Sequence, residues 1–206
     1  MYEGPTTRAL LVAMDLWADQ GIEPPRSRVP DVRDGTLVSV AKGGRAFPAI
    51  PGISYPRVVN ELELLDFGPQ FGKLGGVRTI EPPINGPSYK VLVPKADEDG
   101  IDIAGVHQVE TAAPLGTLTG WNLRTTGHRP GDLCSLNGIY VPFAKTKAER
   151  MANGDPRKSL QERYRDHAGY VKAVTRAAHK LVRERLLLEE DAQAYIDAAN
   201  ASDVLK

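Results

Sequence analysis

The stretch Thr7-Arg-Ala-Leu-Leu-Val-Ala-Met-Asp-Leu-Trp-Ala-Asp-Gln-Gly-Ile-Glu-Pro-Pro25 carries the clearest structural pattern of the chain. Its apolar side chains follow the i, i+3, i+4, i+7 spacing of one helix face, at Leu10, Ala13, Met14 and Trp17. Thr6 or Thr7 can cap the first turn, and Gly21 can adopt the left-handed conformation that ends a helix. The pattern predicts a helix over residues 6–20 whose apolar face lies on a sheet. The long strand-like runs that such a sheet needs do not occur in the sequence.

The composition is that of a globular protein with no strong electrostatic preference. Of the 206 residues, 41% are hydrophobic and 25% are charged, and 26 Lys and Arg balance 26 Asp and Glu. This balance favours neither nucleic acid nor a membrane surface as a partner. The single cysteine, Cys134, excludes an internal disulfide and a cysteine-rich metal site. Because no signal-peptide pattern occurs and no apolar run approaches the ~20 residues that span a bilayer, we expect a soluble protein.

The middle of the chain, residues 21–142, is rich in turn-forming residues. It holds 14 of the 16 prolines and 17 of the 20 glycines, so regular elements there must be short. The clearest predicted element is a hairpin whose strands are 89–95 and 101–109, with Asp97-Glu-Asp-Gly100 as its turn. Shorter strands are predicted at 35–40 and 138–141, and the Pro-rich segment 47–56 is expected to lie extended across another surface.

The last part of the chain, from residue 145, is predicted to be helical. Capping boxes at Thr146/Glu149 and at Ser159/Glu162 begin a short helix and a long one. In the long helix, seven residues alternate at spacings of four and three and form a seam suited to packing on another helix: Leu160, Tyr164, His167, Val171, Val174, Ala178 and Leu181. A final helix is expected after residue 188, with acidic residues in its first turn.

Many short motifs of the chain, taken in order, resemble the C-terminal part of bacterial alpha/beta-hydrolase-domain proteins. The matching segments are Arg8–Trp17, Gly21–Ser27, Asp34–Leu37, Phe47–Gly52, Leu92–Lys95, Asp97–Gly100, Ile103–Gly105, Thr119–Arg124, Pro142–Ala144, Ala148–Arg150, Gly154–Arg157, Ser159–Leu160, Glu162–Tyr164 and Leu186–Leu188. They extend over essentially the whole chain. The resemblance implies an α+β fold in which the last helix of an α/β-hydrolase core (1–21) precedes a Pro/Gly-rich region of short strands and hairpins (22–144) and a helical tail (145–206).

The same resemblance implies hydrolysis of an ester bond by a serine nucleophile in the parent enzyme. In that family the G-x-S-x-G nucleophile elbow and a Gly-Thr-Gln-His segment precede the helix that opens this chain, and neither motif occurs in the 206 residues. No catalytic residue is therefore assigned. The chain is expected to be a scaffold and pocket-lining segment whose partners are the catalytic portion of the hydrolase and a small-molecule ester. The alternative is a non-catalytic interaction module that pairs through its long helix.

The remaining candidate sites have simpler structural explanations. Structural roles are expected for His167 and His179 on helices and for His107 in a cross-strand position. His128 is the one histidine predicted in a loop. The acidic run 97–102 lacks the glycine and glutamate of a calcium-binding loop, so a turn is expected. The eight Lys and Arg of residues 158–185 suit a solvated helix face better than a nucleic-acid site. Cys134 has no catalytic partner at a recognisable spacing.

The loop Thr117-Leu-Thr-Gly-Trp-Asn-Leu-Arg124 is the strongest candidate for substrate binding. Trp121 offers an apolar plane, Asn122 can donate and accept hydrogen bonds, and Arg124 can hold a carboxylate. Two interpretations remain open: Trp121 lines the substrate pocket of the complete enzyme, or it anchors this irregular region on a core. No metal or cofactor is expected.

Overall fold

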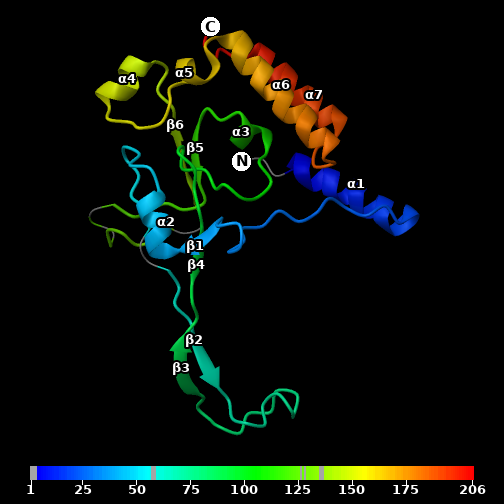
Figure 1. The fold of residues 1–206 in the computed structure, drawn as a ribbon, viewed down its shortest axis with the longest axis vertical. Helices are drawn as coiled ribbons and strands as arrows, with labels where there is room; N and C mark the ends of the chain where they lie inside the picture. The colour runs from blue at the N-terminus through cyan, green and yellow to red at the C-terminus, as the bar shows by residue number, and fades with distance from the viewer. Residues whose placement is uncertain (1–3, 57–58, 126, 128, 135–136) are drawn as a thin grey trace.

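The computed structural model describes residues 4–206 except 57–58, 126, 128 and 135–136. Seven helices and six short strands occur in these residues, and the strands form three separate antiparallel pairs. The mixed α+β class predicted from the sequence is confirmed. Helices α6 and α7 lie side by side at one end of the molecule, and the β2–β3 pair extends from the other end (Figure 1). No helix among the described residues has the length and apolar character to cross a membrane.

Helix α1 spans Gly4–Gln20 and ends as the sequence predicted. Gly21 has φ +68°, and its N–H donates to the carbonyl of Trp17 at 3.0 Å. The predicted caps are wrong, because Thr6 and Thr7 lie inside the helix.

The buried residues of α1 differ from the predicted face, of which only Ala13 is covered. Pro5, Ala9 and Ala13 are buried, whereas Leu10, Met14 and Trp17 are 44%, 55% and 56% exposed. The small Ala9 and Ala13 therefore face the chain, and the large apolar side chains face outward. The Arg8 guanidinium pairs with Asp191 and links α1 to the last helix.

The first strand pair joins β1 (Leu37–Ser39) to β4 (Leu92–Pro94) in antiparallel register, with Val38 opposite Val93. β1 therefore confirms the strand predicted at 35–40. Ser39 also caps helix α2 (Val40–Ala46), since its side chain accepts a hydrogen bond from the Lys42 N–H.

The predicted hairpin over residues 89–109 forms only around its turn. The Asp97 N–H donates to the Ile101 carbonyl at 2.8 Å, and Ala96 pairs with Asp102 in an isolated bridge. The returning strand is wrong, because Gly105 has φ +109°, which interrupts the extended chain, and residues Val109–Ala112 then form helix α3.

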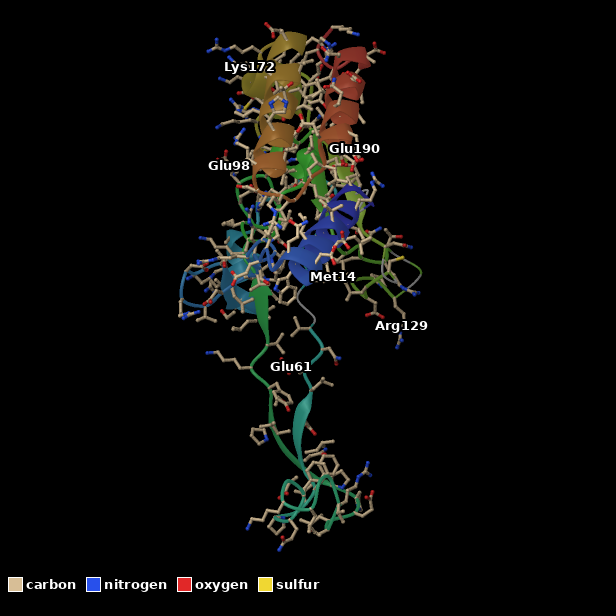
Figure 2. All side chains as sticks on the ribbon, turned by 90° about the vertical axis from the view of Figure 1, so that its right-hand side faces the viewer. Met14, Glu61, Glu98, Arg129, Lys172 and Glu190 are labelled. Carbon is tan, nitrogen blue, oxygen red and sulfur yellow. The ribbon has the colours of Figure 1, made fainter. Side chains whose placement is uncertain are left out.

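The second pair, β2 (Glu63–Asp66) and β3 (Ile84–Ser88), belongs to a projecting arm, residues 60–91. Every residue of both strands is exposed, and Glu61 marks the base of the arm in Figure 2. At its tip the rings of Phe67 and Phe71 stack with centroids 4.7 Å apart, and the Arg78 guanidinium lies 5.2 Å from the Phe67 ring. The tip therefore has a small aromatic nucleus of its own.

The third pair joins β5 (Gly116–Thr119) to β6 (Ile139–Pro142). β6 confirms the strand predicted at 138–141. Beyond it, the Thr146 capping box begins helix α4 (Lys147–Ala152) as predicted, and Gly154 with φ +66° follows its end.

The long helix predicted from Ser159 is two helices. The Ser159 capping box begins α5 (Leu160–Tyr164), and Arg165 then turns the chain with φ +69°. Asp166 caps the following helix, α6 (His167–Arg183), by accepting from the Gly169 N–H at 2.8 Å. A Cβ on Gly169 would lie 1.8 Å from the Tyr164 carbonyl oxygen, so this tight junction requires glycine.

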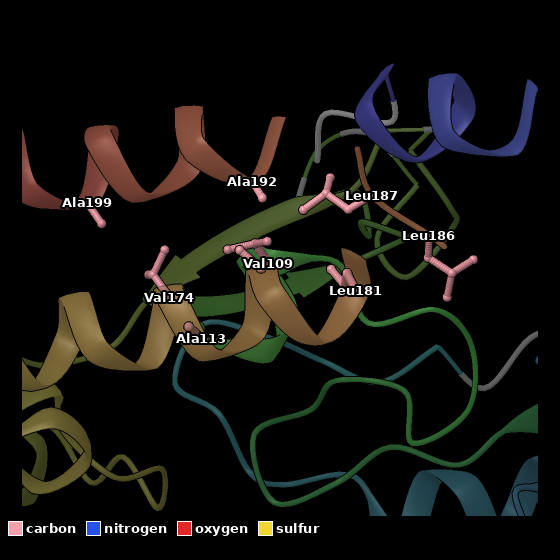
Figure 3. Packing of buried hydrophobic residues seen from close by; sticks show 9 residues of the cluster. Val109, Ala113, Val174, Leu181, Leu186, Leu187, Ala192 and Ala199 are labelled. Atoms are coloured by element: carbon pink, nitrogen blue, oxygen red, sulfur yellow. The ribbon is translucent and has the colours of Figure 1, made fainter. Parts of the chain in front are cut away.

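The main hydrophobic core lies between α3, α6 and α7 (Glu189–Ala201), as Figure 3 shows. Its buried residues are Val109, Ala113, Val174, Ala178, Leu181, Leu186, Leu187, Ala192 and Ala199. The predicted seam of α6 therefore packs against helices of the same chain. His167 adds a second tie, since its Nδ1 lies 2.9 Å from the Val204 carbonyl and its Nε2 lies 3.3 Å from the Asn200 carbonyl.

A buried arginine connects this helical part to the strands. Arg157 is 3% exposed and pairs with Asp155 through a contact of 2.5 Å. Its Nη1 donates to Thr117 Oγ1 at 2.9 Å and to the Val141 carbonyl at 3.0 Å, and its Nη2 donates to the Pro142 carbonyl at 3.3 Å. Burial raises the pKa of Asp155, but the hydrogen bonds from Arg157 outweigh that effect and hold the pKa below its usual value.

We predict that Arg157→Met lowers the free energy of unfolding by about 3–5 kcal/mol, because it leaves Asp155 buried without its counter-charge. Asp155→Asn combined with Arg157→Met should cost less than Arg157→Met alone. Urea unfolding measures both effects. The control is Arg33→Met, which removes an exposed arginine paired with Asp31 and should leave the midpoint unchanged. An Arg157→Met midpoint equal to that of the control would refute a structural role for the pair.

We also predict that the isolated chain binds a hydrophobic dye strongly and melts over a broad range. Leu10, Met14 and Trp17 are about half exposed and so forfeit about half of the roughly 1.5–3 kcal/mol that full burial of each contributes, a sum that matters against a typical total stability of about 5–15 kcal/mol. Replacing all three by glutamine should reduce dye binding with little change in melting temperature. A sharp transition well above about 65 °C without dye binding contradicts this prediction.

Candidate functional site

A cavity of about 540 Å³ lies between β4, the 96–107 segment and the loop after β5. Phe47, Tyr55 and Trp121 form one wall. The Phe47 and Tyr55 ring centroids are 5.2 Å apart. The Trp121 ring centroid lies 5.7 Å from that of Phe47 and 5.8 Å from that of Tyr55. The three rings therefore pack on one another with tilted planes, a favourable arrangement for aromatic side chains.

Two glycines allow the aromatic wall to form. A Cβ on Gly43, in α2, would lie 2.9 Å from the Tyr55 hydroxyl oxygen and 2.8 Å from Val93 Cγ2. A Cβ on Gly100, which has φ +76°, would lie 3.0 Å from Phe47. Helix α2 and the 97–100 turn can therefore approach the rings only because these positions carry no side chain.

The polar side of the cavity is formed by Asp102 and His107. Asp102 keeps part of its surface exposed, yet burial by surrounding atoms raises the pKa of its carboxyl, the Asp97 charge raises it further, and His107 lowers it. Burial also raises the pKa of Tyr55, and the Asp102 charge adds to that shift. The Asp102 carboxyl therefore lies near enough to interact with both the Tyr55 phenol and the His107 imidazole on a mostly apolar surface.

The structure separates the three residues of the predicted substrate-binding loop. Trp121 faces the 540 Å³ cavity, whereas Asn122 and Arg124 line a neighbouring hollow of about 360 Å³ that Trp121 also borders. Two hydrogen bonds to backbone carbonyls hold this loop: the Thr119 side-chain Oγ1 donates to the Trp121 carbonyl at 2.5 Å, and the Cys134 N–H donates to the Asn122 carbonyl at 2.8 Å. Both the pocket and the anchor interpretation of Trp121 are compatible with its half-buried position.

The histidines take different positions. His107 does not lie in a strand as predicted; it follows the interrupted bridge, and its Nε2 is 3.1 Å from the Ile103 carbonyl. His167 makes the structural contacts described above, and His179 is exposed on α6. His128 lies outside the described residues.

The acidic run forms the predicted turn. Asp97 Oδ1 accepts from the Asp99 N–H at 2.9 Å and from the Ile101 N–H at 3.0 Å, and Asp99 pairs with Arg163. Both carboxylates are therefore engaged in local structure. Cys134 is half-buried beside the Trp121 loop.

Sequence reasoning missed Phe47, Tyr55 and Asp102 as cavity residues. The one available signal was the Pro-rich 47–56 segment, which was expected to lie across another surface and carries an aromatic residue near each end. Its partner could not be identified, because Trp121 is more than sixty residues away and no periodic pattern connects them.

A comparison with protein families identifies a match of residues 2–197 to the model of the alpha/beta hydrolase domain. Comparisons with curated proteins and with solved structures gave no match.

Proposed function

Because the chain belongs to the alpha/beta hydrolase domain family, we propose that it supplies scaffold and part of the substrate-pocket wall of a serine hydrolase that cleaves ester bonds. In this proposal the nucleophile and its histidine lie outside these 206 residues, and the chain does not catalyse hydrolysis alone. The family match supports the hydrolase class.

The first support is chemical. The sequence contains no G-x-S-x-G elbow, and among the described residues no serine hydroxyl makes a hydrogen bond to a histidine. Acyl transfer by serine needs a base within hydrogen-bond reach of the hydroxyl and a third group that orients the base. Candidate residues for this chemistry are present, but the described part of the chain does not assemble them.

The second support, and the one on which the proposal depends, is the outward face of α1. Leu10, Met14 and Trp17 form an apolar helix face, yet the three strand pairs among the described residues are short and antiparallel, and none lies beneath this face. Amphipathic helices of α/β folds bury such a face on a mostly parallel sheet. The exposed face therefore fits a helix whose sheet is supplied by the catalytic portion of the hydrolase.

The alternative function, a non-catalytic interaction module, draws support from a different element. The seam of α6 packs on α7 within the chain, so pairing through that helix would have to displace α7. The arm is better placed, since Leu62, Leu64 and Leu65 are exposed along it. Two-stranded ribbons are only marginally stable in water, so contact with another protein would stabilise the arm.

The test of the hydrolase proposal is serine labelling. We predict that the purified chain hydrolyses short activated esters no faster than the buffer blank and is not labelled by a fluorophosphonate probe, because it lacks an activated serine. The upstream DNA should encode a G-x-S-x-G and a Gly-Thr-Gln-His, and co-expression of that polypeptide should give a complex labelled at the elbow serine. Labelling of the chain alone at one of its own serines would contradict the proposal.

Trp121→Ala in the complete enzyme distinguishes between the two interpretations of Trp121, as a wall of the substrate pocket or as an anchor of the loop. A pocket wall predicts a lower kcat/KM with a nearly unchanged melting temperature. If Trp121 is an anchor, the substitution should lower the free energy of unfolding by nearly as much as Trp→Ala at a buried position, which costs about 3–5 kcal/mol. The folded fraction should then show normal kinetics. Asn122→Ala is the cross-check: the half-buried Asn122 side chain makes no hydrogen bond to the described residues, so its loss should cost less than the about 1–3 kcal/mol of a buried, hydrogen-bonded amide. A Trp121→Ala enzyme unchanged in both stability and kinetics excludes both roles.

A further inference from the structure

We propose that the cavity walled by Phe47, Tyr55 and Trp121 binds an apolar small molecule whose polar end is a protonated amine held by Asp102. This inference adds a ligand class to the pocket-lining role proposed above and rests on it for the place of the pocket in the enzyme.

The size and lining of the cavity suit a small molecule. Its volume of about 540 Å³ lies in the range of about 300–1,000 Å³ that is usual for ligand sites. Aliphatic side chains complete the aromatic wall, among them Val59, Val93, Ile101, Leu118 and Leu133. Sites of this kind take an apolar body and fix its orientation through a few polar groups.

The polar groups available to a ligand are those that make no contact elsewhere. Among the described residues, the Asp102 carboxylate accepts no hydrogen bond and forms no ion pair, although its backbone pairs with Ala96. The Tyr55 hydroxyl and the Trp121 indole N–H likewise have no hydrogen-bond partner in the described part of the chain. By contrast, Asp97 on the same turn accepts hydrogen bonds from two backbone N–H groups through its Oδ1.

The charge of the lining favours a cation. Its ionisable side chains are Tyr55, Asp102 and His107, and no lysine or arginine contributes to the described lining. His107 has one ring nitrogen at the Ile103 carbonyl. Aromatic faces attract cations, and the Asp102 carboxylate, which forms no ion pair with another described residue, can form one with a ligand. An ammonium group on an apolar body therefore matches both the aromatic wall and Asp102. A carboxylate in place of the ammonium group would be repelled by the Asp102 carboxylate.

The test compares three probes with one apolar body: 4-phenylbutylamine, 4-phenylbutan-1-ol and 4-phenylbutyrate. Binding is followed by the fluorescence of Trp121 in a Trp17→Phe variant, so that adsorption to the exposed face of α1 is not read out. We expect the amine to bind about tenfold more tightly than the alcohol, a difference of about 1.4 kcal/mol. The carboxylate should bind least.

Asp102→Asn and Glu98→Gln form a matched pair of variants. Each removes one negative charge from the same turn region, but Glu98 lies outside the cavity lining and contacts Lys158 at 3.5 Å. Asp102→Asn should weaken amine binding about tenfold and leave the alcohol within about twofold. Glu98→Gln should leave both affinities unchanged. Circular dichroism confirms that the variants are folded.

Three results overturn the inference: no change in Trp121 fluorescence with any probe, equal binding of amine and carboxylate, or an unaltered amine affinity in Asp102→Asn. If Asp102→Asn does not fold, the ranking of the three probes on the Trp17→Phe chain decides alone. These measurements involve no ester cleavage. A failure here therefore leaves the serine-hydrolase proposal standing, and that proposal fails separately in the fluorophosphonate experiment.

Discussion

The guanidinium of Arg157 is buried where the helical part of the chain meets its strands, and it is hydrogen-bonded on several sides. It holds the Asp155 carboxylate, the Thr117 hydroxyl and two carbonyls of β6. The Thr117 hydroxyl in turn donates to the Asp99 carbonyl, which links the network to the 97–100 turn. Arg163 pairs with the Asp99 side chain. A planar group with five fixed donors can make so many contacts at once, which an ammonium group cannot do. One side chain thus fixes β5, β6, the 155–159 segment and the 97–100 turn relative to one another.

The candidate site depends on this network through the turn. Gly100 at the end of the turn allows Phe47 to approach, and Phe47 packs on Tyr55 and Trp121. Asp102 follows two residues later and reaches the cavity because the Ala96–Asp102 bridge closes the turn. The cavity is therefore built mainly from loops, but these loops are attached to a buried ion pair and to a strand pair. Such an arrangement gives irregular chain the rigidity that a binding site requires.

The sequence predicted those features that depend on neighbouring residues. Both capping boxes, the Gly21 helix end and the Asp97 turn form as expected, since each needs only a few residues in the right order. The division of the long helix at Arg165 was not predicted, because Asp166 and Gly169 are compatible with a helix until the close approach of the Tyr164 carbonyl is known. The outward orientation of Trp17 and the grouping of Phe47, Tyr55 and Trp121 were missed for a related reason. Periodicity identifies an apolar face or an aromatic residue, but contacts between distant segments decide what covers it.

The distribution of buried apolar residues explains why one chain can combine a well-packed helical end with exposed apolar surfaces. The main core lies between α3, α6 and α7, and the short 184–188 connection brings α6 and α7 together at little entropic cost. The Pro/Gly-rich region adds few buried apolar residues, among them Val38, Ile50 and Ile101, and relies on Arg157 and the aromatic cluster instead. α1 is attached through Ala9, Ala13 and the Arg8–Asp191 pair, while Leu10, Met14 and Trp17 remain exposed. A chain organised in this way holds its cavity together through polar contacts and leaves the apolar face of α1 exposed.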